Sequence, residues 1–318
     1  MPTGFGRTSY IGWVEEDPYG TLVTPPTKWA ELIGEDIRTI RTRTPRPVFR
    51  GLDVAETDLY DEKEGAEGTF TFELNYNDAL RLLEHALGVG ATVNEEVAIR
   101  DAHTFTLTDP LMTDKGLTFY VNKGVDEYQV SGCKISNVRW TFDPARNGQM
   151  EVTIVGQNVI GVAPTAPTFP NVARYIAGHQ ATVEIDTVAR NFDSLEITLN
   201  NALDIDKRIL GSKSIDQPVR GDSRREITAI LRVDALDTDW DNFRAGTEFQ
   251  LEVNHVGPVL GNDTFRAEWN MLKCKHMTDP IRLESPGIIK AEWDVKILKP
   301  TAGEMLSIVF ASDESVIA

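Results

Sequence analysis

Apolar and polar residues alternate over many short runs of this chain. The segment Thr69–Asn75 places Phe70, Phe72 and Leu74 on one face and polar side chains on the other. Alternation over runs of this length is typical of antiparallel strands with one buried and one solvated face. The pattern therefore predicts a mainly β protein. The same period of two recurs in His103–Thr108, Val138–Phe142, Met150–Ile154, Leu195–Leu199, Ile227–Val233, Phe249–Val253 and Ala291–Ile297.

Two segments have helical spacing instead. Asp78–Leu87 repeats leucine along one stripe, and Thr238–Ala245 spaces Trp240 and Phe243 about one turn apart. Each segment is followed by a glycine, which commonly ends a helix. We expect two short helices, each with its apolar side chains packed on a sheet.

The order of these elements repeats along the chain. A strand, an acidic turn, a helix and a glycine occur in both halves, and strands with Cys133-Lys134 or Cys274-Lys275 follow. An Arg-Gly pair lies upstream in each half, at 50–51 and 220–221, and the first half has extra residues at about 89–101. Ordered self-similarity predicts that one β-rich domain with a single helix was duplicated.

Proline marks the proposed boundaries. Residues 161–171 read GVAPTAPTFPN, and proline at this density excludes helix and central strand, so a stiff linker is expected. Residues 1–30 also contain several prolines and are predicted to form an extended arm. The predicted organisation is a first domain over 1–163, a linker over 164–171 and a second domain over 172–318.

The chain has 318 residues and a formal net charge of −17. Such a chain repels nucleic-acid phosphates, because affinity for DNA comes largely from cations that displace counterions. The charge fits either simple solubility or a surface past which DNA moves without adhering. No secretory signal and no apolar run near the roughly 20 residues of a membrane span is present. Two cysteines make no disulfide framework, which fits synthesis in a reducing cytoplasm.

Two charge runs are adjacent near the N-terminus. Residues 53–67 are strongly acidic and predict a solvated, mobile loop. The preceding run, residues 37–50, contains arginine and no acid. It predicts either a DNA contact or, because the chain is so acidic, an interface with acidic surfaces of neighbouring copies. The arginines of this run are Arg38, Arg41, Arg43, Arg46 and Arg50.

The sequence contains no motif that predicts catalysis, a cofactor or a metal. Cys274 and His276 lie two residues apart without further ligands nearby, which favours a structural role. The aspartates Asp237, Asp239 and Asp241, with Glu248, superficially resemble a calcium loop, although it lacks the turn glycine. Their alternative role is at a helix start, with Asp237 or Thr238 as N-cap. The remaining histidines also lack metal-ligand spacing; they are His85, His103, His179 and His255.

Several stretches taken in order resemble the tail tube (major tail) proteins of bacteriophages with long, non-contractile tails. The opening TSYIGWVEEDPYGT resembles the start of that family, and GTFTFELNYNDALRLLEHALG resembles its strand and helix. HTFTLTDPL, LTFYV and VSGCKISNVRWTF resemble the strands that follow. The similarity covers roughly residues 9–160 and extends more loosely into the second half. No catalytic residue is carried over from this family.

The resemblance implies tandem β-sandwich or half-barrel domains, each with one short flanking helix. It also implies a virion protein whose rings stack into a tail tube, which encloses the tape-measure protein and later conducts DNA. Other expected partners are the tail terminator and the distal tail protein. Such rings commonly present about six domains, so a chain with two fused domains is expected to form a homotrimer with pseudo-sixfold symmetry. Residues 1–30, 53–67 and 89–101 are the expected inter-subunit segments.

A virion-associated β-sandwich that acts as a binding or adhesion module is the alternative. It needs a platform of exposed aromatic side chains, whereas most tryptophans here lie on apolar faces of predicted elements. An enzyme is a third possibility, and it rests only on the clusters of acidic residues.

Overall fold

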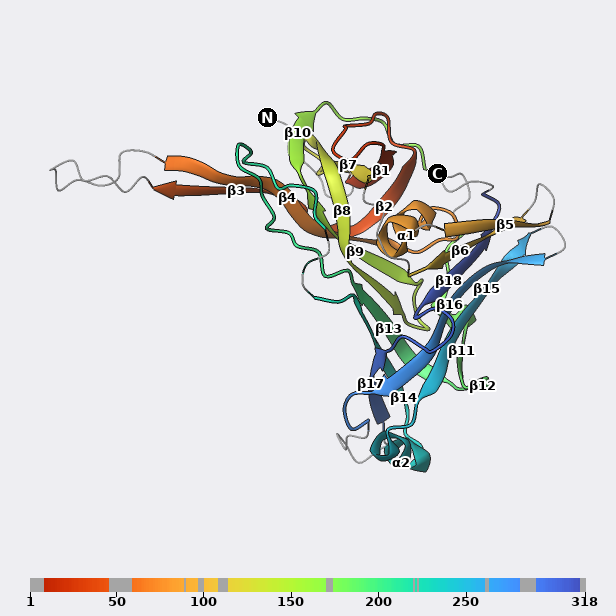
Figure 1. Cartoon of the computed structure of the whole chain (residues 1–318). Helices are drawn as coiled ribbons and strands as arrows, with labels where there is room; N and C mark the ends of the chain where they lie inside the picture. The colour runs from red at the N-terminus through yellow and green to blue at the C-terminus, as the bar shows by residue number, and fades with distance from the viewer. Residues whose placement is uncertain are drawn as a thin grey trace.

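A computed structural model describes residues 9–45, 59–88, 90–96, 100–107, 114–169, 174–219, 221, 223–260, 263–280 and 290–314. The prediction of a mainly β protein is confirmed (Figure 1). The first half contains β1 (Tyr10–Glu16), β2 (Lys28–Glu35), β3 (Arg38–Pro45), β4 (Leu59–Glu73), α1 (Leu80–Leu87), β5 (Gly90–Glu96), β6 (Arg100–Thr106), β7 (Gly116–Asn122), β8 (Glu127–Phe142), β9 (Gln149–Gly156) and β10 (Asn158–Val162). The second half contains a short 3-10 turn, η2 (Gly178–Gln180), then β11 (Ala181–Ile185), β12 (Val188–Ala189), β13 (Phe192–Asn200), β14 (Glu226–Asp234), α2 (Asp237–Ala245), β15 (Phe249–Leu260), β16 (Asp263–His276), β17 (Lys290–Ile297) and β18 (Ser307–Ser312).

Strands of the first half close into a barrel. Each neighbouring pair in the circuit β1–β2–β4–β9–β8–β7–β1 is antiparallel. Closure leaves no open edge around that circuit, which a flat sheet of the same strands would expose. The long strand β8 makes the closure feasible, because its first part pairs with β7 and its second part with β9.

The prediction of an extended arm over residues 1–30 is wrong for its described part. Ile11 and Trp13 are fully buried in β1, which pairs with both β2 and β7. Pro18, Pro25 and Pro26 all lie in the connection between β1 and β2, where they do not interrupt a ladder. The prolines therefore marked the loop, and the strands beside it complete the barrel. Residues 1–8 lie outside the described residues.

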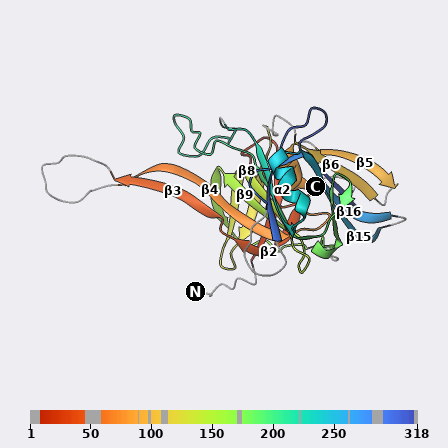
Figure 2. The ribbon, with the colours of Figure 1, turned by 90° about the horizontal axis from the view of Figure 1, so that it is seen from below.

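The prediction of a mobile loop over residues 53–67 is also wrong where the structure describes it. Residues 59–67 belong to β4 and pair with β3 in a hairpin that projects from the body (Figures 1 and 2). The register sets the arginine run opposite the acidic run, with Arg38 opposite Glu67 and Arg41 opposite Glu64. Opposite charges across a strand pair stabilise it, so two runs that look like loops separately form one hairpin. Residues 46–58 lie outside the described residues.

The second half repeats the strand neighbours of the first. The order β15–β16–β17–β14 repeats β7–β8–β9–β4. Strand β11 pairs with β15 as β1 pairs with β7, and β18 pairs with β16 as β10 pairs with β8. The described part of the second half does not close, because no ladder joins β11 to β13. It is a half-barrel beside a closed barrel.

A matched β-bulge lies beside the Cys-Lys pair in each half. In the first half, Leu117 pairs with Cys133 and Phe119 with Val130, so one strand takes three steps where its partner takes two. In the second half, Phe249 and Leu251 oppose Cys274 and Met271 in the same way. Each thiol donates to the carbonyl three residues earlier, at 3.3 Å in the first half and 3.6 Å in the second. Both cysteines are buried and unoxidised.

The extra residues at about 89–101 form most of a second hairpin. Strand β5 pairs with β6, and β6 pairs in turn with β18 of the second half. No described strand of the second half takes the place of this hairpin. It is therefore an insertion that connects the two halves.

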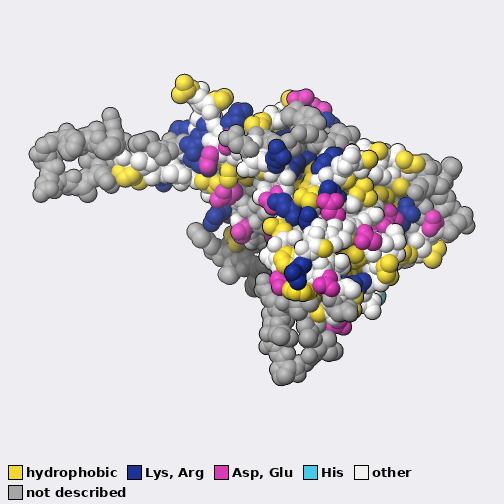
Figure 3. All heavy atoms as spheres, turned by 60° about the horizontal axis from the view of Figure 1, so that its bottom comes forward, with side chains coloured by type: hydrophobic (Ala, Val, Ile, Leu, Met, Phe, Trp, Pro, Cys, Tyr) yellow, Lys and Arg dark blue, Asp and Glu magenta, His cyan; other side chains and the backbone are white. Residues whose placement is uncertain are grey.

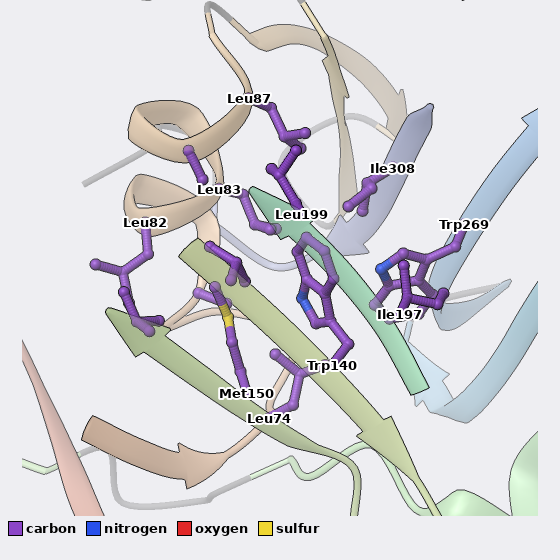
Figure 4. Packing of buried hydrophobic residues seen from close by; sticks show 14 of the residues in the cluster. Leu74, Leu82, Leu83, Leu87, Trp140, Met150, Ile197, Leu199, Trp269 and Ile308 are labelled. Atoms are coloured by element: carbon purple, nitrogen blue, oxygen red, sulfur yellow. The ribbon is translucent and has the colours of Figure 1, made fainter. Parts of the chain in front are cut away.

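The halves share one sheet and one hydrophobic core. Strand β8 pairs antiparallel with β13 of the second half, with Trp140 opposite Ile197. In Figure 4, the leucines of α1 point toward Trp140, Met150 and Leu199. Strand pairing crosses between the halves at β8–β13 and at β6–β18. The division into two domains at residues 164–171 stays a prediction.

The α1 helix begins two residues later than predicted and buries its leucine stripe.

The packing expected for α2 is wrong: Trp240 is 41% exposed, whereas Asp239 is 2% exposed. The N-cap is Leu236, whose backbone N–H donates to Asp239 Oδ2 at 2.9 Å. The carboxylate of Asp239 also binds Arg190 through both oxygens, at 2.8 and 2.9 Å. A buried ion pair thus takes the position that the spacing assigned to an aromatic side chain.

Candidate functional site

One face of the shared sheet is polar from end to end, and we call it the polar sheet face. It spans β4, β9, β8, β13, β14 and β17, whose opposite face holds the core. Apart from Ile230, its members are polar or charged, and acidic side chains outnumber basic ones. The polar sheet face consists of Thr69, Thr71, Glu73, Asn137, Arg139, Thr141, Gln149, Glu151, Thr153, Glu196, Thr198, Asn200, Glu226, Thr228, Ile230, Arg232, Asp234, Lys290, Glu292, Asp294 and Lys296.

Strand alternation produces this face. Along each strand, every second residue points to the core. The residues between them point to the opposite, solvated face, where polar side chains are favoured. Thr69 and Thr153 lie opposite each other with their hydroxyl oxygens 3.2 Å apart. The face is continuous across both halves because β8 and β13 pair in register.

Cross-strand ion pairs hold most of its basic side chains. Arg139 lies 3.0 Å from Glu151 and 3.8 Å from Glu196, on the strands at either side of it. Arg232 pairs with Glu292 at 2.9 Å. Such half-exposed pairs contribute little to stability, but they neutralise the cations. The charge left over on this face is negative.

Lys290 lies at one end of the polar sheet face. Its Nζ donates to Asp193 at 2.7 Å and to Asp234 at 2.6 Å. These two hydrogen bonds raise the pKa of Lys290 above its ordinary value. The ammonium is therefore engaged by carboxylates of its own chain, and a DNA phosphate would have to compete with them.

Two backbone edges remain open beside this face. Strand β3 pairs only with β4 within the described residues. At the other end of the sheet, residues 277–280 run along β17: Met277 N–H donates to the Asp294 carbonyl at 2.7 Å and Glu292 N–H to the Pro280 carbonyl at 2.9 Å. No described strand pairs with the far side of residues 277–280. Exposed edges of this kind are templates for pairing with another chain.

The arginine run divides between the described and undescribed parts. Arg38, Arg41 and Arg43 lie on β3, and Arg38 Nη2 is 3.2 Å from Glu67 Oε1. Arg46 and Arg50 lie outside the described residues. In Figure 3, basic side chains gather where the projecting hairpin leaves the body. Lys63 contacts Asp206 at 2.6 Å there, so the long loop of the second half lies against the hairpin base.

Asp239, one of the suspected calcium ligands, has other partners. Asp239 is used by Arg190 and by the start of α2, as described above. Among the described residues, no cluster of three or more histidine, cysteine or acidic side chains is arranged to hold a metal. His276 packs on Phe249 and Trp293, with ring centroids 5.1 and 4.7 Å away, which agrees with the structural role expected for it.

An aromatic platform is not assembled on the described surface. Every tryptophan except Trp240 is buried, and the Arg244 guanidinium stacks over the Trp240 ring at 4.6 Å. This arrangement disfavours the adhesion module. Sequence reasoning missed the polar sheet face as a unit, although its signal was the polar half of each alternating run.

The proline-rich segment is fixed at its start. Thr165 donates its backbone N–H and its hydroxyl to the two oxygens of Glu127, each at 2.9 Å. Tyr10 donates to the Thr165 carbonyl at 2.5 Å. Glu127 is fully buried, so these bonds replace its lost hydration. The segment therefore leaves the first half from a defined position.

No helix in the described part of the chain has the length and apolarity needed to span a membrane. No curated protein matches the chain. A family model described as phage tail tube protein matches residues 6–295, which is most of the chain. With its mainly β fold and its polar sheet face, the chain belongs to the phage tail tube protein family and is a structural component of the virion.

Proposed function

We propose that three copies of this chain close into a ring and that rings stack into the tube of a phage tail. Each chain contributes two domains, 1–163 and 172–318, so the ring has pseudo-sixfold symmetry. The polar sheet face lines the lumen. The tube encloses the tape-measure protein during assembly, ends at the tail terminator and the distal tail protein, and conducts DNA during ejection.

The observation that carries this proposal is the continuous sheet with one polar face and two open edges. Closing such a sheet through identical copies removes both edges and buries no charged face. The repeated strand order gives each chain two similar units, which supports three copies in a six-unit ring. The projecting β3–β4 hairpin and the β5–β6 hairpin are our candidates for contacts with neighbouring copies.

Electron microscopy of the purified full-length chain tests the proposal. We expect rings or tubes, formed alone or when the tape-measure protein is added, and a reconstruction with three chains per ring. A species that stays monomeric at high concentration with tape-measure protein present would contradict the tube. Six chains per ring would contradict the trimer alone, and would mean that one unit of each chain lies outside the wall.

The proposal also predicts weak interaction with DNA. The net charge and the surplus of acids on the polar sheet face oppose phosphate binding. We expect no shift of duplex DNA at physiological salt in an electrophoretic assay, corresponding to a dissociation constant above about 10⁻⁴ M. Tight, salt-sensitive binding would argue against a non-adhesive conduit and would direct attention to the arginines of β3.

A further inference from the structure

The internal junction between β8 and β13 has an unused counterpart at each end of the chain. The chain contains two similar units, and the β8–β13 pairing joins them through one edge of each. Each unit therefore keeps one further edge that is equivalent to β8 or to β13 and has no partner of this kind. The register of strand pairing identifies those edges residue by residue. The inference that follows rests on the proposed ring.

Equivalent positions follow from the ladders. Val155 pairs with Lys134 and Glu67, just as Lys296 pairs with Lys275 and Thr228. Lys134 and Lys275 each follow a cysteine at the end of a matched bulge. The counterpart of Glu67 is therefore Thr228.

The next ladder extends the correspondence to the edge strand. Arg38 pairs with Glu67 as Thr198 pairs with Thr228. Strand β3 therefore takes the place that β13 has in the second half. In β13, the far edge is occupied by β8, with Thr198 opposite Arg139. In β3, the corresponding edge has no strand partner among the described residues.

The partner edge is identified in the same way. Arg139 pairs with Glu151, whose counterpart in β17 is Glu292. Glu292 N–H donates to the Pro280 carbonyl at 2.9 Å, so Pro280 takes the place of Arg139. The segment that contains Pro280 therefore takes the place of the second part of β8.

We propose that β3 of one copy pairs antiparallel with residues 277–280 of a second copy, with Arg38 opposite Pro280 and Ile40 opposite Thr278. The junction repeats β8–β13 between chains. It joins the second half of one copy to the first half of the next, and three such junctions close the ring.

The backbone of β3 suits this register. Asp36 N–H donates to the Thr69 carbonyl at 2.9 Å, and alternation along the strand then directs the amides of Arg38 and Ile40 toward β4. The backbone of Arg38 therefore accepts no hydrogen bond from the residue opposite it in the junction. Proline fits that position, because it has no backbone N–H. The amide of Thr39 points to the open edge, opposite Asp279.

Exposure and side-chain contacts are consistent with strand pairing between β3 and residues 277–280 of another copy. Thr39, Thr278 and Asp279 are all exposed in the single chain, and Met277 is 50% exposed. The outward-facing groups of Ile37 are occupied by side chains: its N–H donates to Glu35 Oε2 at 3.0 Å, and its carbonyl accepts from Lys123 Nζ at 2.5 Å. Charged groups that cover a strand edge discourage pairing with wrong partners.

The same correspondence assigns Arg41 a contact. Its counterpart is Asn201, which donates to the Ala86 carbonyl at the end of α1 at 3.0 Å. Across the proposed junction, Arg41 approaches the end of α2, where Gly246 lies beside Lys275.

Disulfide trapping in assembled protein tests the register. The double variant Ile40→Cys/Thr278→Cys puts two thiols at a non-hydrogen-bonded pair, where Cα atoms lie about 4.5 Å apart, within disulfide range. Oxidation with copper phenanthroline should link most chains through disulfides that a reductant breaks. The largest linked species should be a covalent trimer. The native Cys133 and Cys274 are fully buried, and burial raises the pKa of Cys274 to about 12, so they stay unreactive.

A matched control moves one thiol along the same strand face. In Thr44→Cys/Thr278→Cys, the two positions are about 13 Å out of register, too far for a disulfide, and we expect monomers on a non-reducing gel. Thr39→Cys/Asp279→Cys provides a second in-register pair if the first variant folds poorly. Tubes seen by microscopy without either in-register disulfide, or with equal linking of the control, would overturn the register and leave the tube intact. Absence of any assembly would overturn the proposed function and the junction together.

Discussion

Replacing Arg225 with methionine should lower the free energy of unfolding by about 3–5 kcal/mol, because a buried hydrogen-bonded cation is lost and its partners stay buried. Arg225 is 8% exposed and donates to the carbonyls of Ala86 and Leu87 at 2.6 and 3.2 Å. It also donates to Asn201 Oδ1 at 2.8 Å, and Asn201 bridges to the Ile135 carbonyl at 2.9 Å. These bonds attach the end of α1 to the second half.

The measurement is chemical and thermal denaturation of the purified subunit. For a chain of this size, the expected loss corresponds to a fall in Tm of about 5–8 °C. The matched control is Arg224→Met, at an exposed neighbouring arginine, which should change stability by less than about 0.5 kcal/mol. Equal effects of the two substitutions would contradict the assigned role of Arg225 at the α1 terminus.

Thr39→Pro should abolish ring and tube formation while leaving the single chain folded. The Thr39 amide points to the open edge of β3, so proline removes a hydrogen bond of the proposed junction and none of the β3–β4 ladder. Its ring also obstructs an incoming strand. We expect assembled material to fall below detection by sedimentation and electron microscopy, with unfolding of the subunit changed by about 1 kcal/mol or less.

Thr39→Val is the control for this substitution. Valine keeps the amide and favours the strand, so assembly should be retained. Normal tubes from Thr39→Pro would show that the Thr39 amide does not join neighbouring copies. A misfolded Thr39→Pro subunit would instead contradict the outward direction that we assign to that amide.

Local pattern was sufficient for part of the elements of this fold. The alternating runs identified their strands, and the leucine stripe identified α1, because strand and helix periods are set by neighbouring residues. The duplicated order was also readable, since the Cys-Lys pairs follow matched bulges in both halves. The polar half of each alternating run already contained the polar sheet face, although nothing local said that the runs would join into one sheet.

Long-range pairing was decided only by the tertiary structure. The sequence could not tell that Trp13 lies in a strand that closes a barrel, because its partners are in β2 and β7, and the second is about a hundred residues away. It could not tell that two oppositely charged runs pair as one hairpin, because each run alone is typical of solvated loops. Nor could it predict that Asp239 is buried and Trp240 exposed. The burial of Asp239 depends on its ion pair with Arg190, which lies in the connection between β12 and β13. Periodicity specifies which side of an element is apolar; partners distant in sequence decide what covers that side and which edges stay open.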